Sequence, residues 1–352
     1  MDRTFRIGLV GTGWVAHQHV AGYRAVLGPR AQVVAACDPR ADVLADFCDR
    51  YGVPGRFPDA TAMLAGADLD VLVLLTPPQV REEVLDPAFA AGVHVLVEKP
   101  FGPDAVRAAG YVTAAERAGV HLAVGQNFRW FPEHQWMHQQ LADPGLGALR
   151  SLEARTFQDR PQSPGVWRAA QHRLEMAIFS VHLIDRLQWM AAAAPLAVSA
   201  LTRRDESGDL PGEQSTHLLV QFEGGVVASM TSTWMARGLP ESTMRADLVG
   251  GSVAVHRAGP MAGDATGEVQ LRGGEVVRAS FPDRDDPPHG PRTYGHGLGA
   301  LLDAVEGGYE APHSGRDNLA TMGIMDAAYL SASRGGALVE VAEVLPAPGP
   351  TA

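Results

Sequence analysis

Short apolar runs alternate with helix-like patterns over the first 125 residues. Runs rich in Val, Leu and Ile predict strands at residues 5–10, 32–37, 70–75, 93–97 and 121–125. Between them, the patterns predict helices at residues 15–27, 40–51, 61–65, 80–91 and 104–118. Near-continuous apolar strands that are each followed by a helix are typical of a doubly wound parallel sheet, covered on both faces. We therefore predict an α/β domain over residues 1–125.

The pattern changes after residue 125. The next elements that it predicts are a helix at 130–141, a strand at 148–157, a loop at 158–166 and a helix at 173–190. Three pairs of apolar runs follow, each split by two glycines, at 224/225, 250/251 and 273/274. Each pair of runs predicts a β-hairpin, and together they indicate an antiparallel meander.

The chain closes with two helical stretches and a tail. The helices are expected at 298–306 and 316–333, and the tail at 346–352, PAPGPTA, is expected to be disordered. We take residues 126–345 as a second domain, for substrate binding and oligomerisation, and allow for a C-terminal helix that packs back on the first domain.

Composition narrows the class of protein. A length of 352 residues fits two domains, and 46% hydrophobic with 20% charged residues is an ordinary globular balance. A net charge of −11 argues against nucleic acid as a partner. Two cysteines, Cys37 and Cys48, are too few for a disulfide framework or a four-cysteine zinc site, and we expect no metal. Without a long apolar run or a signal-peptide pattern, we expect a cytoplasmic protein with no membrane partner.

A glycine motif lies between the first predicted strand and helix. Gly11, Gly13 and Ala16 have the G-x-G-x-x-A spacing in the context that dinucleotide binding requires. Gly11 allows a tight turn, and Gly13 lets the backbone approach a pyrophosphate, which the amides at the helix start favour. Cofactor contacts are expected from Gly11, Thr12, Gly13, Trp14 and Val15.

The second predicted strand is followed by an acidic residue, Asp38. A carboxylate at this place can accept hydrogen bonds from the adenosine ribose hydroxyls and would repel a 2′-phosphate. NAD is therefore favoured over NADP, although Arg40 could partly offset that repulsion. The alternative is a turn glycine pair with an unrelated surface aspartate.

Two further strand ends carry unusual residues, Thr76-Pro77-Pro78 and Glu98-Lys99-Pro100. Ligands of doubly wound sheets bind beyond the carboxyl ends of the strands. A lysine placed there is expected to face the cleft, where it can polarise a hydroxyl or carbonyl oxygen. The alternative is an ordinary polar turn.

Taken together, the motifs resemble a known family. They are GTGWVA with a following His at 11–19, CDP at 37–39, TPP at 76–78, VEKP at 97–100, NFRW at 127–130, VWR at 166–168 and VHLIDRLQW at 181–189. In this order they resemble the Gfo/Idh/MocA oxidoreductases over almost the whole chain. The resemblance implies an N-terminal Rossmann domain and a C-terminal α/β domain with a large open, mostly antiparallel sheet that often serves oligomerisation.

The resemblance also implies an activity. We expect an NAD-dependent dehydrogenase that oxidises a secondary hydroxyl of a sugar, cyclitol or related polyol, or reduces the matching ketone. We expect it to form a homodimer or homotetramer through the open sheet. The alternatives are a non-catalytic NAD-binding sensor or regulatory protein, and a sugar hydrolase or epimerase that cycles NAD.

On the predicted helix at 173–190, steps of three and four link Glu175, Ile178, His182 and Asp185 into one stripe. From the stripe alone, His182 is either an acid/base or a structural histidine paired with Asp185. In the family, a histidine in this context accepts the substrate proton together with the EKP lysine, which assigns catalysis to His182 and Lys99.

The family's other residues are carried over in the same way. The resemblance implies further cofactor contacts from Thr76, Pro77, Glu98, Lys99, Trp167 and Arg168. It implies substrate contacts from Lys99, Asn127, Arg129, His182 and Asp185. Arg129 could instead pair with Glu133.

Two positions depart from the family pattern. The acid usual four residues before the histidine is Ile178 here, and Glu175 lies two helical turns from His182. Arg81 stands where many members have a histidine. We therefore expect an atypical substrate pocket.

Overall fold

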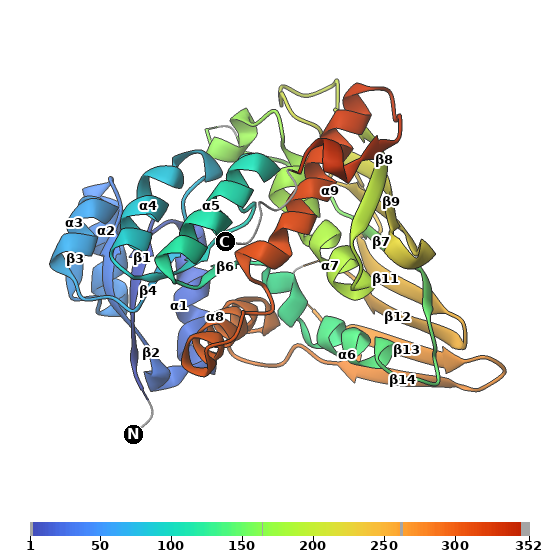
Figure 1. The fold of residues 1–352 in the computed structure, drawn as a ribbon, viewed down its shortest axis with the longest axis horizontal. Helices are drawn as coiled ribbons and strands as arrows, with labels where there is room; N and C mark the ends of the chain where they lie inside the picture. The colour runs from blue at the N-terminus through green and yellow to red at the C-terminus, as the bar shows by residue number, and fades with distance from the viewer. Residues whose placement is uncertain (1–2, 164, 261–262, 346–352) are drawn as a thin grey trace. The chain divides into compact units, whose positions relative to one another are not determined.

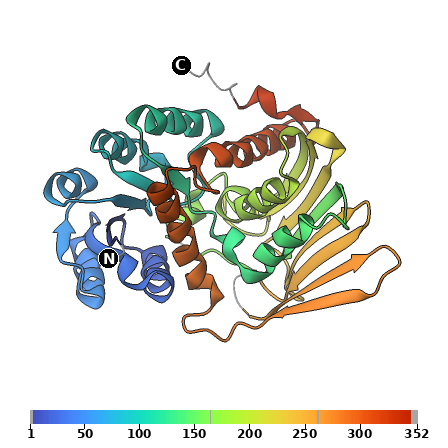
Figure 2. The ribbon, with the colours of Figure 1, turned by 60° about the horizontal axis from the view of Figure 1, so that its bottom comes forward.

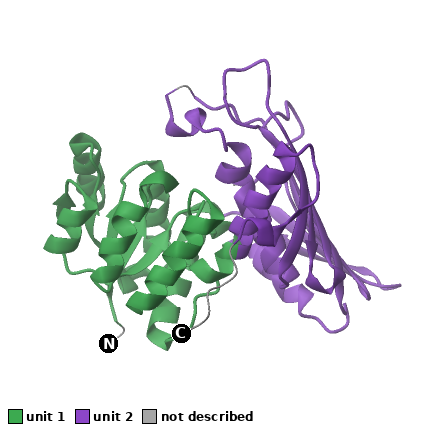
Figure 3. Ribbon diagram, turned by 45° about the horizontal axis from the view of Figure 1, so that its top comes forward, with its two compact units in different colours: residues 1–130, 285–319 green, residues 131–284, 320–352 purple. Residues whose placement is uncertain are grey.

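The structure is a computed structural model that describes residues 3–163, 165–260 and 263–345; the predicted tail lies outside the described residues. The chain forms two compact units (Figure 3). The first comprises the residues up to Trp130 and Asp285–Leu319, and the second comprises Phe131–Arg284 and the residues from Ala320 onward. Each unit is therefore built from two separate stretches of the chain.

The first unit contains a parallel sheet, which confirms the predicted doubly wound fold (Figure 1). Within the described residues the strand order is β3-β2-β1-β4-β5-β6. The strands are β1 (Phe5–Val10), β2 (Ala31–Cys37), β3 (Gly55–Phe57), β4 (Val71–Leu74), β5 (His94–Val97) and β6 (Leu122–Val124). Five of these agree with the predicted strands to within one residue at each end. β3 was not predicted, because three residues carry too little pattern.

Helices connect these strands. They are α1 (Trp14–Val26), α2 (Ala41–Tyr51), α3 (Ala60–Gly66), α4 (Glu82–Ala90) and α5 (Ala105–Ala118). Asp59 and Asp104 cap α3 and α5, because each carboxylate accepts a hydrogen bond from a backbone amide of the first turn. Three 3₁₀ turns, η1 (Gly28–Arg30), η2 (Pro78–Val80) and η3 (Asn127–Trp130), complete this stretch.

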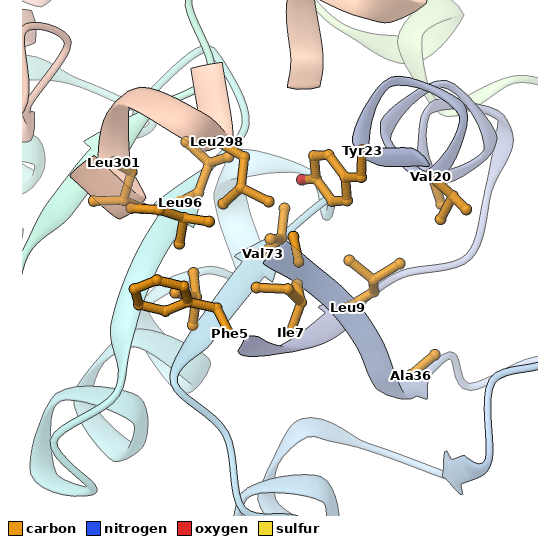
Figure 4. Packing of buried hydrophobic residues seen from close by; sticks show 14 of the residues in the cluster. Phe5, Ile7, Leu9, Val20, Tyr23, Ala36, Val73, Leu96, Leu298 and Leu301 are labelled. Carbon is orange, nitrogen blue, oxygen red and sulfur yellow. The ribbon is translucent and has the colours of Figure 1, made fainter. Parts of the chain in front are cut away.

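A late helix, α8 (His289–Gly307), belongs to the same unit. It packs on α1 through glycines: a Cβ on Gly22 would lie 2.1 Å from the Pro291 carbonyl oxygen, and one on Gly295 would lie 2.3 Å from that of Gly22. Its leucines, Leu298 and Leu301 among them, join the core over β1 and β4 (Figure 4). The predicted start at residue 298 is wrong, because glycine-rich sequence hides a helix that packing stabilises.

The second unit contains the other predicted sheet. Within its described part the order is β14-β13-β12-β11-β7-β10-β9-β8-β15, mostly antiparallel. Its strands are β7 (Leu149–Phe157), β8 (Pro195–Arg203), β9 (Ser215–Phe222), β10 (Val227–Thr233), β11 (Glu241–Leu248), β12 (Gly251–Arg257), β13 (Ala265–Leu271), β14 (Val276–Phe281) and β15 (Val339–Glu340). The three hairpins, β9–β10, β11–β12 and β13–β14, are confirmed. The simple meander is wrong, because β7 lies between β10 and β11 and runs parallel to β10.

Helices α6 (Pro132–Leu141) and α7 (Val181–Ala191) pack on this sheet, and α9 (Gly315–Ser333) carries the chain from the first unit into the second (Figures 1 and 2). The helix predicted at 173–190 begins later, at Glu175, and passes through a π-helical turn, η5 (Met176–Ser180). Two short 3₁₀ turns, η6 (Glu223–Gly225) and η7 (Val341–Glu343), lie at strand ends, and η4 (Trp167–Ala170) lies in the loop region before α7. Among the described helices, none is long and apolar enough to cross a membrane.

Candidate functional site

The glycine loop forms the turn between β1 and α1. Gly11 has a φ of +96°, a left-handed conformation that favours glycine, and its amide donates to the Cys37 carbonyl oxygen at 2.8 Å. Gly13 is the N-cap of α1, and a Cβ added to it would meet no described atom within 4 Å. Because a glycine N-cap brings no side chain to the first amides of the helix, this end of α1 suits an anionic group.

Asp38 follows β2 and is buried beside the glycine loop. The Thr12 amide donates to its carboxylate at 2.9 Å, and the Thr12 hydroxyl lies at 3.1 Å. The Arg40 guanidinium binds both carboxylate oxygens, at 3.0 and 3.1 Å. Burial by itself would raise the pKa of Asp38, but the hydrogen bonds from Arg40 and the Thr12 amide lower it below its usual value. The end of β2 therefore presents an ionised acceptor, while Arg40 lies directly on it.

Glu98 and Lys99 follow β5. The Lys99 amide donates to the Glu98 carboxylate at 3.1 Å, and His19 Nε2 lies 3.0 Å from the same carboxylate. His19 Nδ1 is 2.7 Å from the Tyr23 hydroxyl. Burial alone would raise the pKa of Glu98, but the hydrogen bond to His19 and the nearby charges lower it. His19 was part of the recognised motif, yet sequence reasoning gave it no role.

Lys99 is half-buried. It is the only lysine in the sequence, and all other members of the 29 lysine and arginine residues are arginines. An arginine stays protonated in proteins, whereas a lysine amine can lose its proton when its surroundings lower its pKa. The end of β5 therefore carries the one side chain of the sequence that ends in an ammonium group rather than a guanidinium.

The TPP loop follows β4, next to β5 in the sheet. The Thr76 hydroxyl is buried, and among the described protein atoms it has no hydrogen-bond partner. A buried polar atom without a partner fits a position that a bound ligand contacts. Together with the glycine loop and Asp38, this hydroxyl makes the carboxyl edge of the sheet a fitting site for a dinucleotide.

In the second unit, His182 lies on α7 and is buried, with the Phe179 ring edge-on at 6.5 Å between centroids. Ile178 is buried on the π turn. Asp185, one turn beyond His182, is buried and accepts a hydrogen bond from the Thr321 hydroxyl at 3.3 Å. The structure thus places the predicted histidine and aspartate on one helix.

Glu175 does not continue that stripe. Its carboxylate accepts hydrogen bonds from the hydroxyls of Ser180, Thr216 and Ser232, at 2.7, 2.7 and 2.6 Å. Burial raises its pKa to about 7, although the three hydroxyls act in the opposite direction. The expected stripe from Glu175 to His182 on an unbroken helix is wrong, because the π turn between them adds a residue and changes the side-chain directions.

Asn127 and Arg129 are buried in the first unit. The Asn127 amide donates to the Thr293 hydroxyl at 2.9 Å, and Arg129 donates to the Pro312 carbonyl and to Asp317 at 2.7 and 2.6 Å. Glu133, the alternative partner of Arg129, binds Arg257 at 2.8 Å in the second unit. Several hydrogen-bond donors of Asn127 and Arg129, which we predicted to contact substrate, therefore bind groups of the protein itself.

Trp167 and Arg168 lie in η4. Trp167 is exposed, and the Arg168 Nε is buried without a partner among the described residues. Among all the residues that the structure describes, no group of three or more His, Cys, Asp or Glu side chains could hold a metal ion.

Two family models match the chain. Residues 5–126 match the oxidoreductase family with an NAD-binding Rossmann fold, and residues 134–253 match the GFO/IDH/MocA C-terminal domain. The first match spans the glycine loop, Asp38 and Lys99, and the second spans His182.

Full-length relatives point the same way. The chain is 27% identical over 347 residues to D-apiose dehydrogenase of Paraburkholderia graminis, covering 95% of this chain and 89% of that one. It is 25% identical over 333 residues to inositol 2-dehydrogenase of Rhizobium meliloti, covering 93% and 97%. An oxidoreductase from Agrobacterium radiobacter, solved with NAD+, L-tartaric acid and magnesium, shares the fold, with a TM-score of 0.87, 22% identity, and coverage of 96% and 99%.

Proposed function

Since the chain belongs to the Gfo/Idh/MocA family of oxidoreductases, with an NAD-binding Rossmann domain, we propose that it is an NAD-dependent dehydrogenase of a sugar, cyclitol or related polyol. It oxidises a secondary hydroxyl or reduces the matching ketone. The single lysine at the carboxyl end of β5 carries the proposal. The full-length relatives named above are dehydrogenases, which favours this reaction over a sensor or an NAD-cycling hydrolase or epimerase.

In this proposal, residues 1–125 form the NAD-binding domain and supply most of the contacts to the cofactor. The pyrophosphate lies over Gly11–Val15 at the start of α1, and Asp38 binds the ribose and disfavours NADP. The remaining contacts assigned to NAD are Thr76, Pro77, Glu98, Lys99, Trp167 and Arg168. When bound, NAD supplies the hydride chemistry, while the protein provides orientation and proton transfer.

Lys99 and His182 handle the proton. Lys99 polarises the reacting oxygen, and His182 takes the proton in oxidation or gives it in reduction. Asn127, Arg129 and Asp185 complete the substrate half. Ile178 gives this half an apolar side chain where the family pattern has an acid, so the substrate pocket differs in polarity from that of typical members.

We assign oligomerisation and most of the substrate contacts to the second predicted domain, residues 126–345, of which residues 126–130 and 285–319 lie in the first compact unit. The neighbouring strands β8, β9 and β10 carry exposed apolar side chains, Leu201, Leu219 and Val227. A second copy of the chain on this sheet, in a homodimer or homotetramer, would cover them. We place the protein in the cytoplasm, with no nucleic-acid or membrane partner.

Replacing Lys99 tests the function. Lys99→Met and Lys99→Arg should each lower kcat by about 10²–10⁴-fold, the usual effect of a positioned proton-transfer group. Lys99→Met removes the ammonium that polarises the oxygen, whereas Lys99→Arg keeps a positive charge but replaces the compact ammonium by a larger planar guanidinium that does not take the same place beside the oxygen. Reduced nicotinamide absorbance with a panel of sugars and cyclitols measures turnover, and calorimetric titration checks that NAD binding stays within a few-fold. Wild-type turnover by a folded Lys99→Met protein would contradict the proposal.

A further inference from the structure

Arg81 is a fully buried arginine between η2 and α4, with 1% of its surface exposed. Its guanidinium donates to the Thr76 carbonyl oxygen from two nitrogens, at 2.9 and 3.2 Å. It also donates to the carbonyl oxygens of Pro100 and Phe101, the latter at 3.2 Å. One side chain thus binds three backbone carbonyls.

Those carbonyls belong to two different loops. Thr76 lies two residues beyond the end of β4, and Pro100 lies three residues beyond the end of β5. β4 and β5 are parallel neighbours, paired up to Leu74 and Val97. The backbone pairing ends with the hydrogen bond from the Glu98 amide to the Leu74 carbonyl oxygen at 2.9 Å, and beyond it the Arg81 side chain connects the two loops. A planar guanidinium with several donors in a rigid fork suits that task.

Lys99 is fixed on both sides by this arrangement. Its own amide donates to the Glu98 carboxylate, and the carbonyl of the next residue, Pro100, accepts from Arg81. Burial lowers the pKa of Arg81 to about 10, while the Glu98 charge acts in the opposite direction, so the guanidinium is a cation at neutral pH. The carboxylate that binds the Lys99 amide therefore also offsets the charge that binds the Pro100 carbonyl.

We propose that Arg81 is a positioning residue for Lys99. Its guanidinium holds the loops after β4 and β5 at the separation that proton transfer requires. This inference rests on the proposed role of Lys99. A histidine offers at most two donors, and a lysine has its donors on a single nitrogen, so neither reproduces the bonds that three guanidinium nitrogens make to three carbonyls.

A purely structural arginine is the competing explanation. Loss of Arg81 leaves buried carbonyl groups without partners and destabilises the fold in either case. A matched control is Arg257 in the second unit, which is also buried and binds Glu133 and the Gly263 carbonyl oxygen. Arg257→Met should lower stability without touching the Lys99 loop.

The unique lysine provides a readout that needs no cofactor. An amine-selective acetylating reagent, followed by peptide mass mapping, reports the reactivity of the Lys99 amine in the protein without NAD. The mapping separates Lys99 from the chain's α-amino group and from any introduced lysine. The same preparations give kcat, KM and the pH profile of kcat, all well below the lowest melting temperature.

In Arg81→Met, we expect kcat to fall by about 10²-fold, the effect of a misplaced reacting group, with KM for NAD within a few-fold. We expect Lys99 acetylation to become several-fold faster, because the loop no longer holds the amine half-buried, and the pH profile to move. Arg81→Lys should restore part of kcat, because an ammonium can still bind one carbonyl. Arg257→Met should lose stability only.

The proposal fails if folded Arg81→Met acetylates and turns over like Arg257→Met. Should Arg81→Met not fold, the same readouts on Arg81→Lys decide, and wild-type values there would overturn the proposal. Full turnover by Lys99→Met is a separate outcome: it sinks the dehydrogenase mechanism, whereas the acetylation rates still show whether Arg81 holds the Lys99 loop.

Discussion

Two buried glutamates, one in each unit, have opposite surroundings. Glu98 in the first unit precedes Lys99 and is 7% exposed, and Glu175 in the second unit begins the helical segment that carries His182 and is 0% exposed. Glu98 lies near cationic and imidazole groups, with His19 in direct contact. Glu175 is held by three neutral hydroxyls. Both residues are buried, and their carboxyl groups differ in their partners.

The partners decide the charge of each carboxyl. Burial acts to raise both pKa values, yet His19 with the Lys99 and Arg81 charges lowers that of Glu98, whereas that of Glu175 is raised to about 7. Hydroxyl donors favour the carboxylate but bring no opposite charge to offset its desolvation. Depth of burial alone therefore does not indicate whether a carboxyl in this fold is ionised.

The two shifts couple to stability with opposite signs. Glu98 has a lowered pKa, so its contribution is present above the pKa of the unfolded chain and is lost as the pH falls through its folded pKa. Glu175 has a raised pKa, so its contribution is complete below the unfolded value and is lost as the pH rises through about 7. Acidification therefore weakens the first unit at Glu98 and strengthens the second at Glu175.

Of the variants that test this comparison, Glu98→Gln should lower the free energy of unfolding most. It removes the carboxylate that offsets Arg81, so a buried cation loses its counter-charge, which costs about 3–5 kcal/mol of unfolding free energy at neutral pH. Thermal unfolding between pH 3 and pH 8 measures the loss, which should shrink as the pH falls below 4.5, the ordinary pKa of a glutamate. Glu116→Gln, which removes an exposed ion pair with Arg316, is the control and should be nearly neutral. Equal melting temperatures for Glu98→Gln and wild type at neutral pH would refute the role of the Glu98 charge.

Glu175→Gln should remove the loss of folding stability that Glu175 causes as the pH rises. A shift from 4.5 to about 7 corresponds to up to about 3 kcal/mol, at about 1.4 kcal/mol per pKa unit, lost by the wild type as the pH rises across that range. The glutamine does not ionise, so the variant should melt at a more constant temperature from pH 5 to pH 8. We also expect kcat to change mildly, because the carboxylate is bound by hydroxyls of its own unit. A loss of kcat as large as that of His182→Ala would instead make Glu175 the compensating acid.

The surroundings of the two glutamates also show which features of this protein the sequence predicts and which it does not. The glycine loop, Asp38 and Lys99 are readable because each follows a strand whose apolar run is itself visible. The hairpins of the second sheet are readable because two glycines mark each turn. These signals are local, and the structure reproduces them closely.

Long-range contacts determine the features that the local sequence pattern does not predict. His19 meets Glu98 across 79 residues, and Glu175 meets Thr216 and Ser232 across 41 and 57. The π turn forms where the Glu213 carboxylate accepts from the Leu174 and Met176 amides, a contact that no pattern near residue 175 indicates. The insertion of β7 between β10 and β11 is another such pairing. Side-chain partners and strand order thus come from tertiary structure that periodicity does not encode.

The smallest expected effect tests one hydroxyl. Thr216 and Thr156 are both buried in the second sheet, but only the Thr216 hydroxyl donates to Glu175, whereas the Thr156 hydroxyl has no partner among the described residues. Thr216→Val should therefore cost about 1 kcal/mol at pH 5, where Glu175 is protonated, and about 2 kcal/mol at pH 8, where the hydrogen bond is to a charged group. Thr156→Val keeps the same shape change and should be neutral or slightly stabilising at both pH values. Melting temperatures of the two variants at pH 5 and pH 8 give the comparison, and a Thr216→Val cost that does not grow with pH would mean that Glu175 keeps the same charge throughout.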